Sequence, residues 1–122
     1  MTDILFQFGD LRIQASFNDS STAQIIASAL PIESRVNRWG DEIYFEIPAK
    51  LPPEQSTVDL NVGDIAYWPE GSCLCLFFGR TPASIDERPR PASDVNIVGR
   101  FSESAEPLRK VAAGATVRVM KR

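Results

Sequence analysis

The side chains that could carry chemistry in this sequence are carboxylates, arginines and two cysteines, because none of the 122 residues is a histidine. Without histidine, the Ser-His-Asp and Cys-His catalytic arrangements cannot be assembled. Acid–base chemistry would therefore fall to the 16 aspartates and glutamates. These are spread along the chain, mostly beside basic residues or in turns, which is typical of a solvated surface.

The two cysteines, Cys73 and Cys75, lie two residues apart in an apolar run. On a β-strand this spacing places both side chains on one face. They are either two small core residues or part of a metal or redox site. The usual four-ligand zinc sites need further cysteines or histidines. We therefore expect no metal and no cofactor.

Two-residue alternation of apolar and polar side chains, interrupted by Gly-Asp turns, predicts a strand-rich chain. In the segment after Gly40-Asp41, for example, Ile43 and Phe45 face one way, and Glu42 and Tyr44 face the other. The apolar run 73–78 favours a strand that is buried on both faces. The expected strands are 4–8, 11–17, 32–39, 42–47, 58–62, 65–68, 73–78, 95–101 and 116–120.

Two short helices are expected between these strands. The first opens near Ser21, where Gln24 completes the pattern of a capping box, and ends at Pro31. The second begins at Ser102 or Ser104 and stops at Gly114. About eight strands with two helices favour a mainly β, closed eight-stranded barrel whose open ends the helices cap.

Length and charge limit the remaining function classes. A chain of 122 residues is the size of one domain, so we expect a single domain over residues 1–122. A net charge of −3 provides no basic surface for nucleic acid. No apolar stretch approaches the roughly 18 residues of a membrane helix, and the first residues lack the features of a signal peptide. We expect a cytoplasmic protein that binds neither nucleic acid nor membranes.

Several motifs in a fixed order resemble the small cyclophilin-like proteins of bacteria and archaea, a family without an established function. They are Leu30-Pro31, the runs Arg38 to Pro48 and Val62 to Pro69, Leu76-Phe77-Phe78-Gly79 and Pro91-Ala92-Ser93. The resemblance covers nearly the whole chain and implies an eight-stranded barrel with two helices.

A fainter similarity to true cyclophilins, the peptidyl-prolyl isomerases, implies a proline pocket. Leu76-Phe77-Phe78 stands where those enzymes carry Gln-Phe-Phe, and Ala66 precedes Phe78 by twelve positions, as in their pocket motif. An arginine that donates hydrogen bonds toward the prolyl nitrogen could lower the rotation barrier. Arg35 or Arg38 would be that catalytic arginine, with Phe45 and Phe78 gripping the ring. The two arginines face opposite ways on one strand, so at most one could serve.

This sequence also departs from the isomerase pattern. The pocket histidine of those enzymes has no counterpart, Leu76 replaces their pocket glutamine, and the loop 81–93 lacks a tryptophan. Their strand motif built around His-Arg, Phe-Met and Gln-Gly-Gly is matched only by an arginine with Phe45.

Two further functions stay open. The first is a binding module, in which a groove on the barrel wall lined by Tyr67, Trp68 and Phe78 holds a proline-containing peptide or a small molecule. Trp39 and Trp68 would be pocket aromatics or would seal the barrel ends. The second is an assembly role for the Pro-rich loop 81–93, with the oligomeric state left open. We favour the binding module, with prolyl isomerisation as the alternative.

Overall fold

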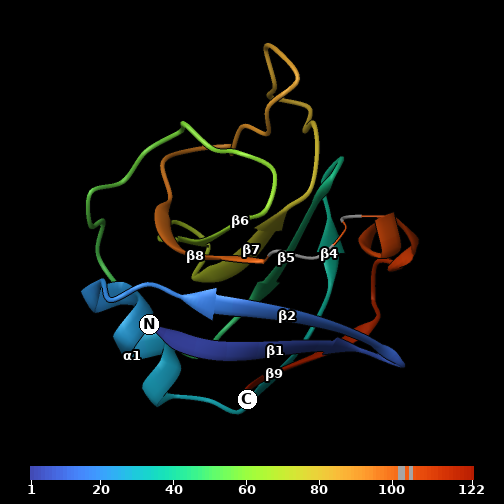
Figure 1. Cartoon of the computed structure of the whole chain (residues 1–122). Helices are drawn as coiled ribbons and strands as arrows, with labels where there is room; N and C mark the ends of the chain where they lie inside the picture. The colour runs from blue at the N-terminus through green and yellow to red at the C-terminus, as the bar shows by residue number, and fades with distance from the viewer. Residues whose placement is uncertain (102–103, 105) are drawn as a thin grey trace.

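Within residues 1–101, 104 and 106–122, the part of the chain that this computed structural model describes, nine β-strands, one α-helix and one 3-10 helix are present (Figure 1). In chain order they are β1 (Thr2–Phe8), β2 (Leu11–Phe17), α1 (Ser21–Ser28), β3 (Ile32–Arg35), β4 (Asn37–Arg38), β5 (Glu42–Glu46), β6 (Asp64–Trp68), β7 (Cys73–Phe77), β8 (Asn96–Phe101), η1 (Glu106–Lys110) and β9 (Thr116–Lys121). The mainly β prediction is confirmed.

All nine strands form one antiparallel sheet that curls into a nearly closed barrel. The strand order is β3-β9-β1-β2-β8-β6-β7-β5-β4. Only Val36 separates β3 from β4, so one extended run pairs with β9 at one end of the order and with β5 at the other. The expected strand 32–39 is thus present as two short strands, and this division raises the strand count above eight. The run 32–38 also brings the two ends of the sheet together.

Alternating side chains divide the apolar residues into two clusters. The inner cluster fills the barrel, and the outer cluster lies on the opposite face of β6, β7 and β8. The inner cluster includes Ile4, Phe6, Ile13, Phe17, Ile43, Phe45, Ile65, Tyr67, Leu74, Leu76, Phe78, Val98, Val117 and Val119. The outer cluster consists of Leu60, Ala66, Cys73, Cys75, Phe77 and Val95, with Tyr44, Trp68 and Ile97 packed against it. Strand β7 belongs to both clusters and is buried throughout, as its apolar run predicts.

Two long connections cover the outer cluster. The connection between β5 and β6 first passes α1 and then joins the connection between β7 and β8 on the side of the molecule away from β1, β2 and β9 (Figure 1). They touch each other where Thr57 and Val95 exchange two backbone hydrogen bonds. The expected strand 58–62 is not a strand. Its apolar periodicity arises because Leu60 packs into the outer cluster while Val62 is half-exposed.

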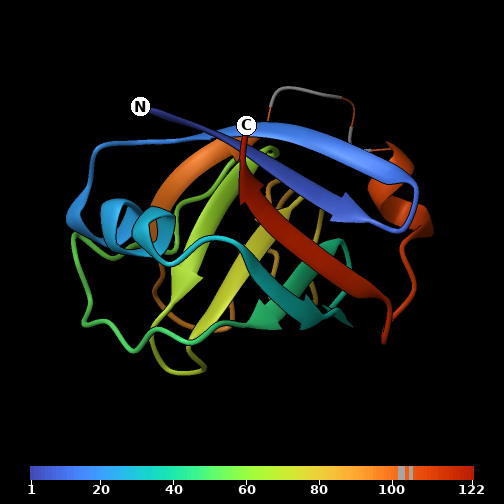
Figure 2. The ribbon, with the colours of Figure 1, turned by 90° about the horizontal axis from the view of Figure 1, so that it is seen from below.

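Helix α1 and the 3-10 helix η1 lie at opposite ends of the barrel (Figure 2). The N-cap of α1 is Ser20 and not Ser21, because the Ser20 hydroxyl accepts the Ala23 amide. Glu54, from the first long connection, accepts the amides of Ser21 and Thr22 and so completes the helix N-terminus. Residue Ala29 ends the helix before Pro31.

The second expected helix is a single 3-10 segment and not an α-helix. It runs only from Glu106 to Lys110, because the Gly114 amide donates to the Val36 carbonyl at 2.7 Å and not to a carbonyl of a longer helix. Of the two serines expected to cap it, Ser102 lies outside the described residues, and Ser104 accepts the Glu106 amide. No helix among the described residues has the length and apolar character needed to cross a membrane.

Candidate functional site

The hairpin between β4 and β5 positions the residues of the candidate site. Trp39 and Glu42 exchange two backbone hydrogen bonds, of 3.0 and 3.2 Å, across the two-residue loop Gly40-Asp41. Gly40 has a φ of 61°, as expected for glycine at the first position of a type II′ turn. The hairpin also contacts the connection between β7 and β8, because the Asp41 amide donates to the Arg80 carbonyl at 2.8 Å. Trp39 and Glu42 are therefore held side by side on a fixed turn.

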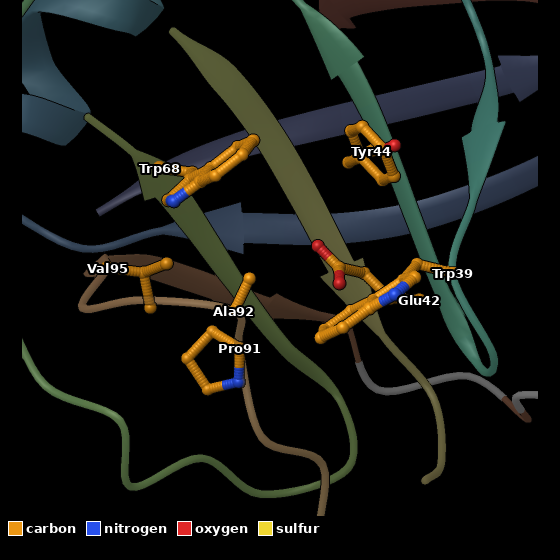
Figure 3. Close-up of a pocket in the computed structure, with 7 residues that line it drawn as sticks. All are labelled: Trp39, Glu42, Tyr44, Trp68, Pro91, Ala92 and Val95. Atoms are coloured by element: carbon orange, nitrogen blue, oxygen red, sulfur yellow. The ribbon is translucent and has the colours of Figure 1, made fainter. Parts of the chain in front are cut away.

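A solvent-open pocket of about 240 Å³ lies over the outer cluster (Figure 3). It is lined by Trp39, Glu42, Tyr44, Trp68, Pro91, Ala92 and Val95. Three of these residues are aromatic, and Glu42 is the only charged one. Figure 3 shows the Glu42 carboxylate pointing into the space between the aromatic rings and the Pro91-Ala92 segment. The pocket is thus an apolar and aromatic hollow with one carboxylate at its base.

Hydrogen bonds and ring contacts hold Trp68 in place. Its indole Nε1 donates to the Ser93 hydroxyl at 2.6 Å, and that hydroxyl donates to Glu70 Oε2 at 3.1 Å. Its ring also meets Tyr44 edge to face, with centroids 6.3 Å apart and planes at 83°. This geometry is one of the preferred arrangements of aromatic pairs. Two of the three aromatic walls are consequently oriented before any ligand arrives.

The connection between β7 and β8 supplies the remaining wall. Its stem is closed because the Thr81 hydroxyl donates to the Arg90 carbonyl. Pro91 directly follows this stem and is buried, although the tip of the same connection is exposed, with Ile85 82% exposed. The Pro-rich loop 81–93 is therefore exposed at its tip. Its returning end forms one side of the pocket, with Pro91 buried and Ala92 exposed.

The electrostatics of the pocket centre on Glu42, whose side chain is only 6% exposed. Burial raises the pKa of Glu42 to about 7, and a hydrogen bond with the Cys75 thiol partly opposes that rise. None of the arginines and lysines in the described residues forms an ion pair with it. The carboxylate charge at the base of the pocket is therefore uncompensated.

The two cysteines lie beneath this pocket in the outer cluster. Both are free thiols and both are buried. Burial raises the pKa of Cys73 to about 11 and that of Cys75 well above its ordinary value. No group of three or more metal-ligating side chains occurs in the described ranges. The thiols contribute packing and the contact with Glu42.

The substrate-binding residues expected from the sequence lie on both faces of the sheet. Phe45, Tyr67 and Phe78 belong to the inner cluster and are at most 1% exposed. The Tyr67 hydroxyl is also engaged, because it donates to the Ala49 carbonyl at 2.7 Å. Ala66 is buried in the outer cluster. Of this set, only Trp68 lines the pocket, so Tyr67 and Phe78 do not share a groove with it.

The structure brings Arg38, but not Arg35, next to Phe78. The Arg38 guanidinium lies 5.2 Å from the centroid of the Phe78 ring, and Arg109 lies at 5.8 Å. Arg38 donates through Nη1 to the Val111 carbonyl at 2.7 Å and through Nη2 to Gly40 at 3.2 Å. Arg35 is exposed and bonds to the Gly114 carbonyl. Arg38 therefore ties the hairpin to the segment after η1, over a ring that solvent does not reach.

Glu42 and Tyr44 are pocket residues that were not selected from the sequence. Alternation correctly placed both on the outward face of β5, where carboxylates are usually solvated. The available signal was their spacing with Trp39, which puts two aromatics and an acid at one hairpin. Nothing periodic in residues 81–95 reveals that this segment folds back over them.

A sequence model of the cyclophilin-like family matches residues 2–120. The chain belongs to this family. Its structure is also similar to the solution structure of a hypothetical protein from Archaeoglobus fulgidus, with a TM-score of 0.84 and 39% sequence identity. That match covers 99% of this chain and 95% of the archaeal one. No curated protein matches the sequence.

The cyclophilin-like relationship explains the barrel, and it comes without an assigned activity. The related archaeal protein is itself described as hypothetical. Because one fold can carry many functions, the function has to come from the chemistry of the site. In this cyclophilin-like protein, that chemistry is concentrated in the pocket around Glu42.

Proposed function

We propose that this protein is a ligand-binding domain that takes a single head group or side chain into the pocket around Glu42. The observation that carries the proposal is a nearly buried carboxylate, without a basic partner among the described residues, which points into an open aromatic pocket. A buried ionisable group with a displaced pKa in a cleft is a frequent mark of a functional site.

The size of the pocket limits what it can hold. Pockets for drug-sized ligands usually occupy about 300–1,000 Å³, whereas this one is about 240 Å³. The pocket therefore suits one terminal group, carried either by a small molecule or by a side chain of a peptide. A proline-containing peptide would have to place one ring or side chain there and leave the remainder on the surface.

Prolyl isomerisation has less support than binding. That activity needs an arginine whose donors can reach a prolyl amide beside an open apolar wall. Arg38 donates to backbone carbonyls, and the adjacent Phe78 is 1% exposed. The binding proposal uses residues that face an open space, and so it is the one we pursue.

Intrinsic fluorescence provides a direct test, because both tryptophans of the chain line this pocket. We expect small ligands that enter it to change tryptophan emission and to shift the indole N–H resonances of Trp39 and Trp68. The ligands to titrate are alkylamines, neutral alcohols and a proline tetrapeptide. The rim variant Ala92→Trp should abolish the shifts of the native indole signals by filling the pocket.

The matched control is Ala113→Trp, which adds the same side chain at an exposed position outside the pocket. This variant should leave the ligand-induced indole shifts unchanged. If no tested ligand perturbs either indole, or if Ala92→Trp binds as well as the parent protein, the pocket is not the binding site.

A further inference from the structure

We infer that the group taken by this pocket is an organic cation, an ammonium head group borne by a small amine or by an amine-bearing side chain. The inference rests on the proposed binding function and adds the chemical class of the ligand. It follows from the way Glu42, Trp39, Tyr44 and Trp68 surround one space (Figure 3).

The charge at the base of the pocket is the first argument. A carboxylate buried in an apolar site either takes up a proton or pairs with a cation, because removal from water penalises an isolated charge. The other residues that line the pocket are aromatic or apolar, and none of them carries a positive charge. No described basic residue supplies the missing partner from elsewhere. A ligand with a positive charge would supply it.

The aromatic walls are the second argument. The faces of tryptophan and tyrosine rings attract cations through their quadrupoles, and this attraction is strongest for tryptophan. Two tryptophans and a tyrosine around one small space are the composition of sites that recognise ammonium groups. The hydrogen bond from Trp68 to Ser93 and the edge-to-face contact with Tyr44 fix two of these three rings in advance. The pocket therefore loses little side-chain entropy when a ligand binds.

The nearby charges favour the same ligand class. Glu70 accepts the Ser93 hydroxyl that holds Trp68, so a second carboxylate lies behind one wall. Glu46 projects from the same face of β5 as Glu42, and both carboxylates raise the pKa of Cys73. An anionic ligand would meet this negative charge, and a neutral one would leave Glu42 unpaired. A cation is attracted by all of these groups.

The experiment compares choline with its uncharged isostere 3,3-dimethylbutan-1-ol at pH 8 and constant ionic strength. Tryptophan fluorescence and calorimetry report the affinities. We expect choline to bind at least about tenfold more tightly than the isostere, because the two differ only in charge. A lysine-bearing and a trimethyllysine-bearing tripeptide, run beside free choline, distinguish a side-chain ligand from a free amine.

The variant Glu42→Gln removes the charge while it keeps the shape, and it should reduce choline affinity about tenfold and leave affinity for the isostere unchanged. The control is Glu33→Gln, which removes an exposed carboxylate on β3 that pairs with Arg118 at 3.5 Å. This control should bind choline as the parent does. Its purpose is to separate a pocket effect from a change in net charge.

The outcomes separate the two proposals. If the isostere binds as tightly as choline, or if Glu42→Gln leaves choline affinity intact, the pocket binds ligands but not cations, and this inference fails alone. If neither compound nor any peptide perturbs the two tryptophans, the binding function itself fails. Selective, Glu42-dependent binding of choline or of either peptide supports both.

Discussion

At the scale of single residues, Glu42 works against the stability of the fold that holds it. Burying its carboxylate disfavours the charged form, and no described basic residue compensates. A glutamine at this position would fill the same space without the charge. Natural proteins tolerate such a destabilising group most often where function requires it.

The stability of the protein should therefore depend on pH through Glu42. Its pKa is about 7 in the folded state against 4.5 as the ordinary value, so the folded protein holds this proton more tightly. The free energy of unfolding should fall as pH rises from about 4.5 to 7 and then level off. The loss is on the order of 3 kcal/mol. Urea denaturation of the parent and of Glu42→Gln at pH 5 and pH 8 measures it.

The variant should lack this decrease and should be the more stable protein at pH 8. The thiol of Cys73, with a pKa near 11, stays protonated across this range and does not interfere. Equal changes in unfolding free energy between pH 5 and pH 8 for parent and variant would show that Glu42 is not the group responsible.

At the scale of elements, the β4–β5 hairpin sets the shape of the site because it is packed as well as hydrogen-bonded. A side chain at Gly40 would place its Cβ 2.9 Å from the Arg80 carbonyl oxygen and 3.0 Å from Cα of Thr81. The turn therefore depends on glycine both for its backbone angle and for space. A shift of this turn moves Trp39 and Glu42 together.

Gly9, in the turn between β1 and β2, is a matched control for Gly40. Both have a φ of 61°, but a Cβ at Gly9 would meet nothing within 4 Å. We expect Gly9→Ala to cost roughly 1–2 kcal/mol of stability from backbone strain alone. Gly40→Ala should cost about 1 kcal/mol or more beyond that because of the close contacts, and it should alter the fluorescence of Trp39. Thermal denaturation that ranks the two variants equally would contradict this account.

Elements with a strict two-residue rhythm were the predictable ones. The burial alternation of β1 and β2 follows directly from their sequences, and β5 keeps it except at Glu42, which is buried on the outward face. Residues 58–62 show the same rhythm, yet one apolar residue there packs against the sheet from a loop. The expected length was wrong at η1, because a helix was expected up to Gly114 and only Glu106–Lys110 is helical, as a 3-10 segment. The local sequence pattern indicates which apolar side chains are buried, whereas tertiary packing determines whether the backbone forms a strand, a helix or a loop.

At the scale of the whole molecule, a buried amide joins three parts of the fold. Asn96, at the start of β8, donates to the Thr22 hydroxyl at 3.1 Å and to the Pro52 carbonyl at 3.0 Å. It also accepts the Glu54 amide at 2.9 Å. Helix α1, the first long connection and the barrel are thereby linked through one side chain that is 1% exposed.

Replacing Asn96 with alanine should destabilise the protein by about 2–4 kcal/mol, because several buried polar groups lose their partner at once. Asn37→Ala, at an exposed position on β4, should stay within about 0.5 kcal/mol of the parent. Chemical denaturation of the two variants measures both values. Similar losses of unfolding free energy in the two variants would contradict the proposal that Asn96 links these parts of the fold.

The candidate site was less predictable than the barrel because it is assembled from segments far apart in the chain. Trp39 and Glu42 come from a hairpin, Trp68 from the end of β6, and Pro91 from a connection without periodicity. The family resemblance pointed instead to Phe78, whose ring is enclosed beneath Arg38. From the sequence, Glu42 is expected to be solvated because it faces outward, and only the position of the Pro91-Ala92 segment shows that it is covered.

The position of β9 in the strand order has a consequence for synthesis on the ribosome. β9 pairs with both β1 and β3, although it is the last strand of the chain. Until β9 has left the exit tunnel, the edges of β1 and β3 that pair with it have no partner. The barrel can therefore close only after translation has passed residue 121. Until then, these unpaired strand edges are available for aggregation or for binding by a chaperone.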